Sequence, residues 1–231
     1  MLQQILTGII GLLIGLIIGF VGANRLNENS NSVQTSTDLN SNPQLNQQIH
    51  SADIKEQSPN GSMIADVQKV LDKAKNEPAN AQAQIEAGDM YAKIGRFAEA
   101  VAFYENALKS NPKDFQTNVK LANAFFDSDQ FEKAAEFYET ALEINPNEVG
   151  ARTDLGITFV ERATPDYERA IREFETSLKT DPKHEPTLYN LSVAYFKKGE
   201  PEKAQTALKQ LETANPNSKL IERLKQILNQ S

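Results

Sequence analysis

Hydrophobic and polar positions follow three different patterns along the chain. Residues 5–23 form an apolar run without a charged side chain, whereas residues 27–61 are rich in Asn, Ser and Gln and hold few apolar residues. From residue 62 onward, apolar residues return at steps of three and four, which is the spacing of one face of an α-helix. The pattern predicts one apolar helix, a polar linker and then an all-α domain.

The apolar run predicts a transmembrane anchor over residues 1–25. As a helix, residues 5–23 would span roughly 28 Å, close to the hydrocarbon thickness of a bilayer. The alternative is a cleaved signal peptide, because Val21-Gly22-Ala23 has the small residues that signal peptidase accepts. No Lys or Arg precedes the run, however, and the run is longer than the apolar core of most signal peptides. We therefore favour a retained, single-pass anchor.

Glycines recur on one face of this predicted helix. Small residues on one stripe let two transmembrane helices pack closely, so the stripe is consistent with a homodimer through the anchor. The simpler interpretation is that glycine is frequent in membrane helices in general. The residues concerned are Gly8, Gly11, Gly15, Gly19 and Gly22.

Residues 26–61 predict a disordered linker, because so few apolar side chains cannot offset the entropy lost on ordering.

Two signals on membrane orientation disagree. Arg25 is the positive charge next to the run, which favours a cytoplasmic soluble domain. The absence of cysteine and the Asn/Ser/Gln-rich linker are common in exported bacterial proteins. We expect a bacterial inner-membrane protein and leave the side of its soluble domain open.

Prolines mark a repeat within residues 62–231. They stand at positions 78, 112, 146, 182 and 216, so the steps between them are 34, 34, 36 and 34. The residue before a proline leaves helical geometry, and proline itself suits the first turn of a helix. Each proline therefore predicts the end of one helix and the start of the next.

Between the prolines, small and aromatic side chains return at the same places. The first half of each unit pairs a small residue with an aromatic one: Gly88 and Tyr91, Ala122 and Phe125, Gly156 and Phe159, Ser192 and Tyr195. The second half of each unit again combines small and large side chains, as in Ala100, Tyr104 and Ala107 and their counterparts further along the chain. These spacings predict two helices per unit that approach closely at the small residues, with the aromatic ring filling the space beside them.

This pattern resembles the tetratricopeptide-repeat (TPR) family. The resemblance implies a right-handed superhelical solenoid of four helix-pair repeats, at about 81–114, 115–148, 149–184 and 185–218. Amphipathic segments at 62–76 and 219–229 are expected to be capping helices, because each unit of such an array covers only its neighbours. The third unit carries two extra residues around Ala163-Thr164-Pro165, and Pro201 is expected to begin a helix.

The composition argues against several kinds of partner and site. The net charge of −7 argues against a nucleic-acid partner, and the absence of cysteine excludes thiolate sites and disulfides. His50 and His184 lie far apart without ligand-like neighbours, and no nucleophile–base pair or phosphate loop is present. We expect no enzyme activity, no metal and no cofactor.

The family resemblance places a peptide-binding groove on the first helix of each unit. An alternative is that some of these residues only pack between units. Chaperone-binding TPR domains hold a carboxylate with Lys, Arg and Asn, but the corresponding positions here include Asp154, so that kind of docking is not expected. The implied groove residues are Ile85, Asp89, Lys93, Val119, Asn123, Phe126, Thr153, Thr158, Val160, Tyr189, Val193 and Phe196.

These expectations combine into a membrane-tethered, non-catalytic scaffold that binds a protein or peptide segment. An alternative within the family is a TPR subunit that presents apocytochrome c to the haem-attachment machinery, since such subunits also join a membrane anchor to a repeat array. The sequence does not identify the partner protein.

Overall fold

The structure, a computed structural model, describes residues 59–229, and its ten elements there are all α-helices. The predicted anchor, its five glycines and most of the predicted linker lie outside these residues. Within 59–229, no helix is both long and apolar enough to cross a membrane. The first helix, α3 (Pro59–Asn76), begins three residues before the predicted boundary at residue 62. The chain divides into two compact units after Asp72, inside α3, and the second unit holds all the later helices.

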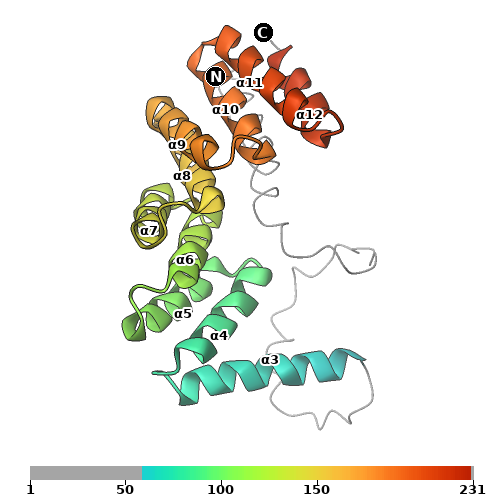
Figure 1. The fold of residues 1–231 in the computed structure, drawn as a ribbon. Helices are drawn as coiled ribbons and strands as arrows, with labels where there is room; N and C mark the ends of the chain where they lie inside the picture. The colour runs from blue at the N-terminus through green and yellow to red at the C-terminus, as the bar shows by residue number, and fades with distance from the viewer. Residues whose placement is uncertain (1–58, 230–231) are drawn as a thin grey trace, which may run out of the picture. The chain divides into compact units, whose positions relative to one another are not determined.

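Within the compact unit that begins at Lys73, eight helices form four consecutive pairs, as the repeat predicts (Figure 1). The second helix of each pair also packs against the first helix of the next, so that the pairs form a continuous array. The pairs are α4 (Ala81–Lys93) with α5 (Phe97–Ser110), α6 (Phe115–Asp127) with α7 (Phe131–Ile144), α8 (Val149–Glu161) with α9 (Tyr167–Thr180), and α10 (Glu185–Lys198) with α11 (Pro201–Ala214).

The prolines end the second helices but do not begin the following ones. For example, α5 ends at Ser110, and α6 begins at Phe115, three residues after Pro112. The proline lies in the intervening turn, and the helix is started by a polar cap instead. The Asp114 carboxylate accepts a hydrogen bond from the Thr117 N–H at 2.8 Å, which satisfies one free donor of the first turn. Pro201, in contrast, is the first residue of α11, as expected.

Small residues allow the two helices of a unit to touch. A Cβ atom added at Gly88 would lie 2.5 Å from the Tyr104 ring, and one added at Gly156 would lie 2.4 Å from the Phe174 ring. Tyr104 and Phe174 are both buried. The predicted close approach at the small residues, with an aromatic ring beside it, is therefore present.

In three of the four repeats, the turn between the two helices contains a residue with positive φ. Gly95 and Gly199 have φ values of 75° and 87°, which glycine adopts without strain. In the second unit the corresponding turn is made by Asp129, whose φ is 58°. The third unit places its extra residues between α8 and α9.

The array ends in α12 (Lys219–Leu228), which packs against α10 and α11. Ile221, Leu224 and Leu228 are buried in a cluster with residues of these two helices, whereas Glu222 and Gln226 face solvent. The predicted C-terminal capping helix is therefore present.

Candidate functional site

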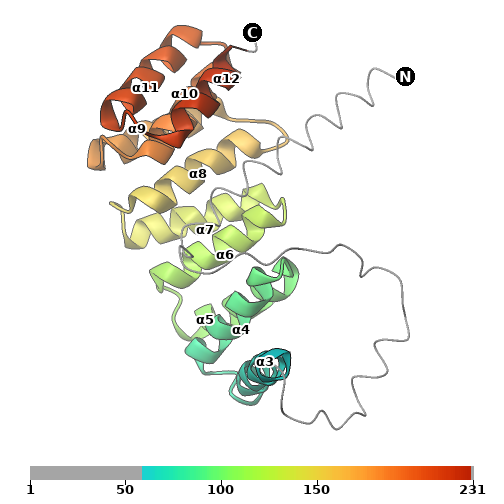
Figure 2. The same cartoon turned by 90° about the vertical axis from the view of Figure 1, so that its right-hand side faces the viewer.

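The first helices α4, α6, α8 and α10 follow one another along one side of the array, with α5, α7 and α9 behind them (Figure 2). We call the side formed by these first helices the first-helix face. The predicted groove residues belong to these four helices, at corresponding places in the repeat. What this face can bind depends on which of those side chains are exposed.

The first two units present polar side chains that tyrosines hold in place. The Tyr104 hydroxyl donates to the Asp89 carboxylate at 2.7 Å, and the Tyr138 hydroxyl donates to the Asn123 Oδ1 at 2.5 Å. Burial raises the pKa of both tyrosines, so each remains a protonated donor at neutral pH. Lys120 of the second unit adds an ion pair to Asp89 at 2.6 Å. Asp89 and Asn123 are therefore fixed in orientation before any partner arrives.

Two aromatic residues keep part of their rings exposed on first helices. Phe126 is half-buried and lies edge-on to Phe131, with 5.3 Å between ring centroids. Phe196, near the end of α10, is also half-buried. The neighbouring Phe125 is only 3% exposed and stacks on Phe137 at 5.5 Å. The assignment of Phe125 to the core and Phe126 to the surface thus agrees with the burial of the two rings.

Seven of the twelve predicted groove residues are half-buried or exposed. They come mainly from the first two units: Ile85, Asp89, Lys93, Val119, Asn123, Phe126 and Phe196. The other five are buried and require correction.

Thr153 and Thr158 are core residues. The Thr153 hydroxyl is buried and lies 2.6 Å from the Thr187 hydroxyl and 3.2 Å from that of Ser177. The Thr158 hydroxyl donates to the Asp154 carbonyl oxygen of its own helix at 2.8 Å, and its side chain is fully buried. Ile157, which is half-buried and stands one repeat after Asn123, occupies the place that the prediction gave to Thr158.

Val160, Tyr189 and Val193 offer little surface, with 6–7% of each residue exposed. Tyr189 and Val193 pack in one cluster with Ile221 and other residues of α12. The capping helix therefore covers the part of the fourth unit that the prediction left open. Tyr189 cannot serve as an exposed anchor beside Phe196 in this conformation.

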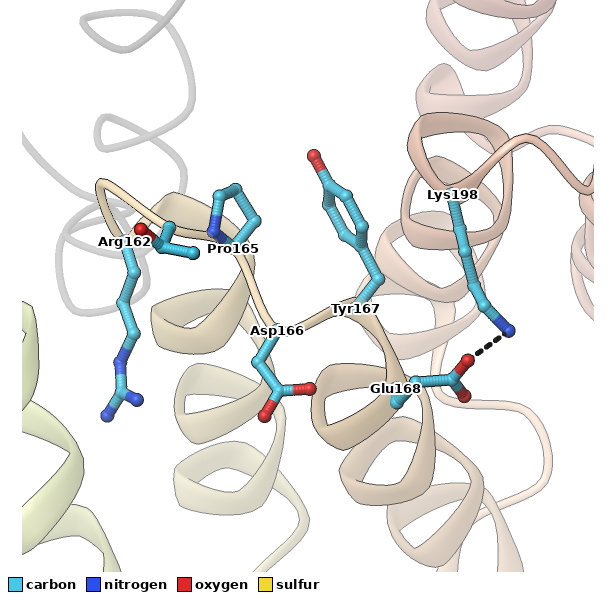
Figure 3. A pocket seen from close by; sticks show the side chains of 7 residues that line it. Arg162, Pro165, Asp166, Tyr167, Glu168 and Lys198 are labelled. Carbon is cyan, nitrogen blue, oxygen red and sulfur yellow. Dashed lines mark ion pairs between the residues drawn. The ribbon is translucent and has the colours of Figure 1, made fainter.

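The loop between α8 and α9 borders a surface hollow of about 540 Å³ (Figure 3). Its cation from α10, Lys198, already has two carboxylate partners, Glu168 at 2.7 Å and Glu200 at 2.5 Å. Figure 3 shows the first of these ion pairs at the rim. The other cation of the hollow, Arg162, lies 4.0 Å from the Glu132 carboxylate. Lys198 is therefore already paired within the protein, and Glu168 and Asp166 add negative charge to the lining, which makes the hollow a poor site for an anionic ligand.

Within the part of the chain whose side chains the structure describes, no group of His, Asp or Glu side chains is arranged to hold a metal ion. The first-helix face is therefore the candidate site that the remaining observations support.

Comparison with known families agrees with the repeat. A family model described as tetratricopeptide repeat matches residues 92–153 and 163–228, and a second one with the same description matches residues 64–115. The chain belongs to the tetratricopeptide-repeat family. No curated protein sequence matches it.

Several solved structures share the fold. YrrB is 22% identical, with a TM-score of 0.61 over 71% of this chain and 86% of YrrB. MamA from Desulfovibrio magneticus RS-1 is 17% identical, with a TM-score of 0.62 over 69% of this chain and 89% of that one. TTC0263 of Thermus thermophilus is 22% identical, with a TM-score of 0.54 over 64% and 82% of the two chains. At these identities the likeness shows the fold alone.

Proposed function

We propose that this protein is a non-catalytic scaffold that binds a segment of another protein on its first-helix face. In the same proposal, residues 1–25 tether it to a membrane and residues 26–58 link the tether to the array. The observation that carries the binding proposal is the pair of half-buried rings, Phe126 and Phe196, on a face where Asp89 and Asn123 are already oriented. Aromatic anchors and fixed polar groups are the usual means by which an interface gains affinity and direction.

The comparison with YrrB supports this proposal. Its structure is described as that of "a TPR protein with an unusual peptide-binding site", so an array of similar fold binds a peptide in that protein. The exposed side chains of the present face come chiefly from the first two units, whereas α12 covers part of the fourth. We therefore place the main contact of the bound segment on α4 and α6, with Phe196 as a second, separate contact.

The first prediction tests this placement with one double and one single variant of the full chain. Phe126→Ala with Phe196→Ala should weaken peptide binding at least about tenfold, because truncating a buried aromatic anchor typically costs about 2 kcal/mol or more. The same double variant should lower the melting temperature little, since both rings already face solvent in part. Phe125→Ala should instead destabilise the fold by about 3–5 kcal/mol, as expected for a buried ring.

Melting curves and binding isotherms on each variant separate the two effects. The peptides are those selected from a displayed random library on the wild-type chain. Normal binding by the Phe126/Phe196 variant, or binding lost only together with folding, would show that the first-helix face is not the binding site.

A further inference from the structure

The capping helix α12 stands where a fifth unit would have its first helix. It begins 34 residues after the start of α10 and lies beside α10 at the end of the array (Figure 2). In this register, Arg223 and Ile227 stand one repeat after Tyr189 and Val193, which are two of the predicted groove residues. Helix α12 therefore continues the first-helix face beyond α10.

The side of α12 that continues this face keeps apolar side chains at its surface. Leu220, Arg223 and Ile227 follow one another at steps of three and four, so they share one side of the helix, and all three are half-buried. Leu220 and Ile227 pack against the same buried cluster as Phe196 of α10, which is also half-buried. We call Phe196, Leu220 and Ile227 the α10–α12 patch. The Phe196 ring thus has apolar counterparts on the capping helix.

Positive charge accompanies these apolar residues on α12. The guanidinium carbon of Arg223 lies 5.9 Å from the centre of the Tyr189 ring, within the range of a cation–π contact. Lys219 is exposed, lies on the same side of α12 as Arg223, and forms no ion pair with any residue from 66 to 229. The acid of this helix, Glu222, lies 3.8 Å from Lys225. This end of the face is therefore positive, although the chain as a whole has a net charge of −7.

The Tyr189 hydroxyl adds an independent observation at the same place. It is buried and has no hydrogen-bond partner among the residues that the structure describes, whereas buried hydroxyl groups are normally paired. Burial raises the pKa of Tyr189, and the charge of Arg223 opposes this rise only in part, so the hydroxyl is a protonated donor at neutral pH. A carboxylate beside Arg223 would give this donor an acceptor, after a small shift of the side chains that cover it.

We infer that α12 is a binding helix as well as a cap, and that the α10–α12 patch receives a part of the bound segment in which an Asp or Glu stands beside apolar residues. This inference rests on the proposed function of the first-helix face and names the chemistry of the partner there. The apolar side chains of the segment lie against the patch. Its carboxylate pairs with Arg223, whose planar guanidinium can donate two parallel hydrogen bonds, and Lys219 adds attraction at longer range.

The test uses random peptides displayed on phage and selected on the full chain in a mild detergent. Selected peptides should combine Asp or Glu with apolar residues. For the tightest of them, Lys219→Gln with Arg223→Gln should weaken binding about tenfold and make the remaining affinity less sensitive to salt. A matched control, Arg172→Gln with Lys179→Gln, removes the same charges from exposed positions of α9 and should change affinity less than about twofold. Melting curves check that both variants remain folded.

Two further arms separate this inference from the function beneath it. Replacing the peptide's own Asp or Glu by Asn or Gln should weaken binding to the wild-type chain but not to the Lys219/Arg223 variant, because the same contact cannot be lost twice. If the peptides depend on Phe126 and Phe196 but bind the Lys219/Arg223 variant as well as the wild type, the inferred contact on α12 is wrong and the binding face stands. If no selected peptide depends on Phe126 and Phe196, the proposed function fails, and this inference fails with it.

Discussion

At the scale of single residues, Asp127 shows how one charge can work against the fold that carries it. Its pKa is raised to about 6 in the folded chain, chiefly by burial and further by Asp129, compared with an ordinary value of 3.8. The folded state therefore binds this proton more tightly than the unfolded state. The resulting stabilisation is fully present below about pH 4 and is lost as the pH rises through 6.

Asp127→Asn should accordingly make the protein more stable than wild type at pH 7 to 8, and equally stable at pH 4. The gain at neutral pH should be at most about 1 kcal/mol, because Asp127 is an exposed residue and solvent screens its charge. Urea unfolding of the wild type and the Asp127→Asn variant from pH 4 to 8, followed by circular dichroism, measures the difference between their free energies of unfolding. The contributions of the other titrating groups cancel in this difference. Asp129→Asn, which retains a residue suited to positive φ, should reduce the pH dependence without removing it. A stability difference that is constant over this pH range would contradict the assignment.

The sequence alone could not predict which of two neighbouring residues would be exposed and which buried. Ile157 and Thr158 are neighbours on a helix, so the apolar spacing alone could not decide which of them faces outward. The buried contact of Thr153 with Ser177 and Thr187 was missed because it joins three elements. Its one signal was Ser177, which stands at a position that holds alanine in the first two units. Buried hydroxyl groups need such partners, so a serine at an alanine position indicates others nearby.

At the scale of helices, the glycines of α8 provide a matched pair. Gly156→Ala should destabilise the protein by about 1–3 kcal/mol, because the new Cβ would lie 2.4 Å from the buried Phe174 ring. Gly150→Ala adds the same methyl group to the same helix, yet its nearest contact is the Glu148 carboxylate at 3.5 Å. That variant should be neutral or more stable by up to about 1 kcal/mol, since alanine favours helix. Urea midpoints of the two variants measure the contrast, and equal shifts would show that the α8–α9 contact is not close.

Helices were the most predictable level of the structure. The repeat period, the prolines and the small residues each indicated the same eight helices, and α12 followed from one apolar face. The effect of α12 on its neighbours could not be predicted in this way. An amphipathic pattern shows that a helix is covered but not what covers it, so Tyr189 and Val193 were assigned to an open face although α12 lies over them.

At the scale of the whole molecule, the attachment of the array decides where it meets its partner. Residues 5–23 are apolar enough to span a bilayer as a helix. They lie outside the residues that the structure describes, so their role as an anchor stays a prediction. If they form a retained anchor, the full-length chain should stay in the membrane fraction after a carbonate wash, and deletion of residues 1–25 should release it. The deletion should leave the array folded, because α4 to α12 form their contacts within the unit that begins at Lys73.

Mass spectrometry of the native chain completes this last prediction. A retained anchor requires an intact N-terminus, whereas a mature form that begins at Asn24 would identify residues 1–23 as a cleaved signal peptide. The binding face would then be unchanged, but its geometry relative to the partner would differ. A tethered array meets its partner within the reach of the linker, roughly 30–35 Å for about 35 flexible residues. A released array would lose that local concentration, so its partner would need a correspondingly higher affinity for the first-helix face.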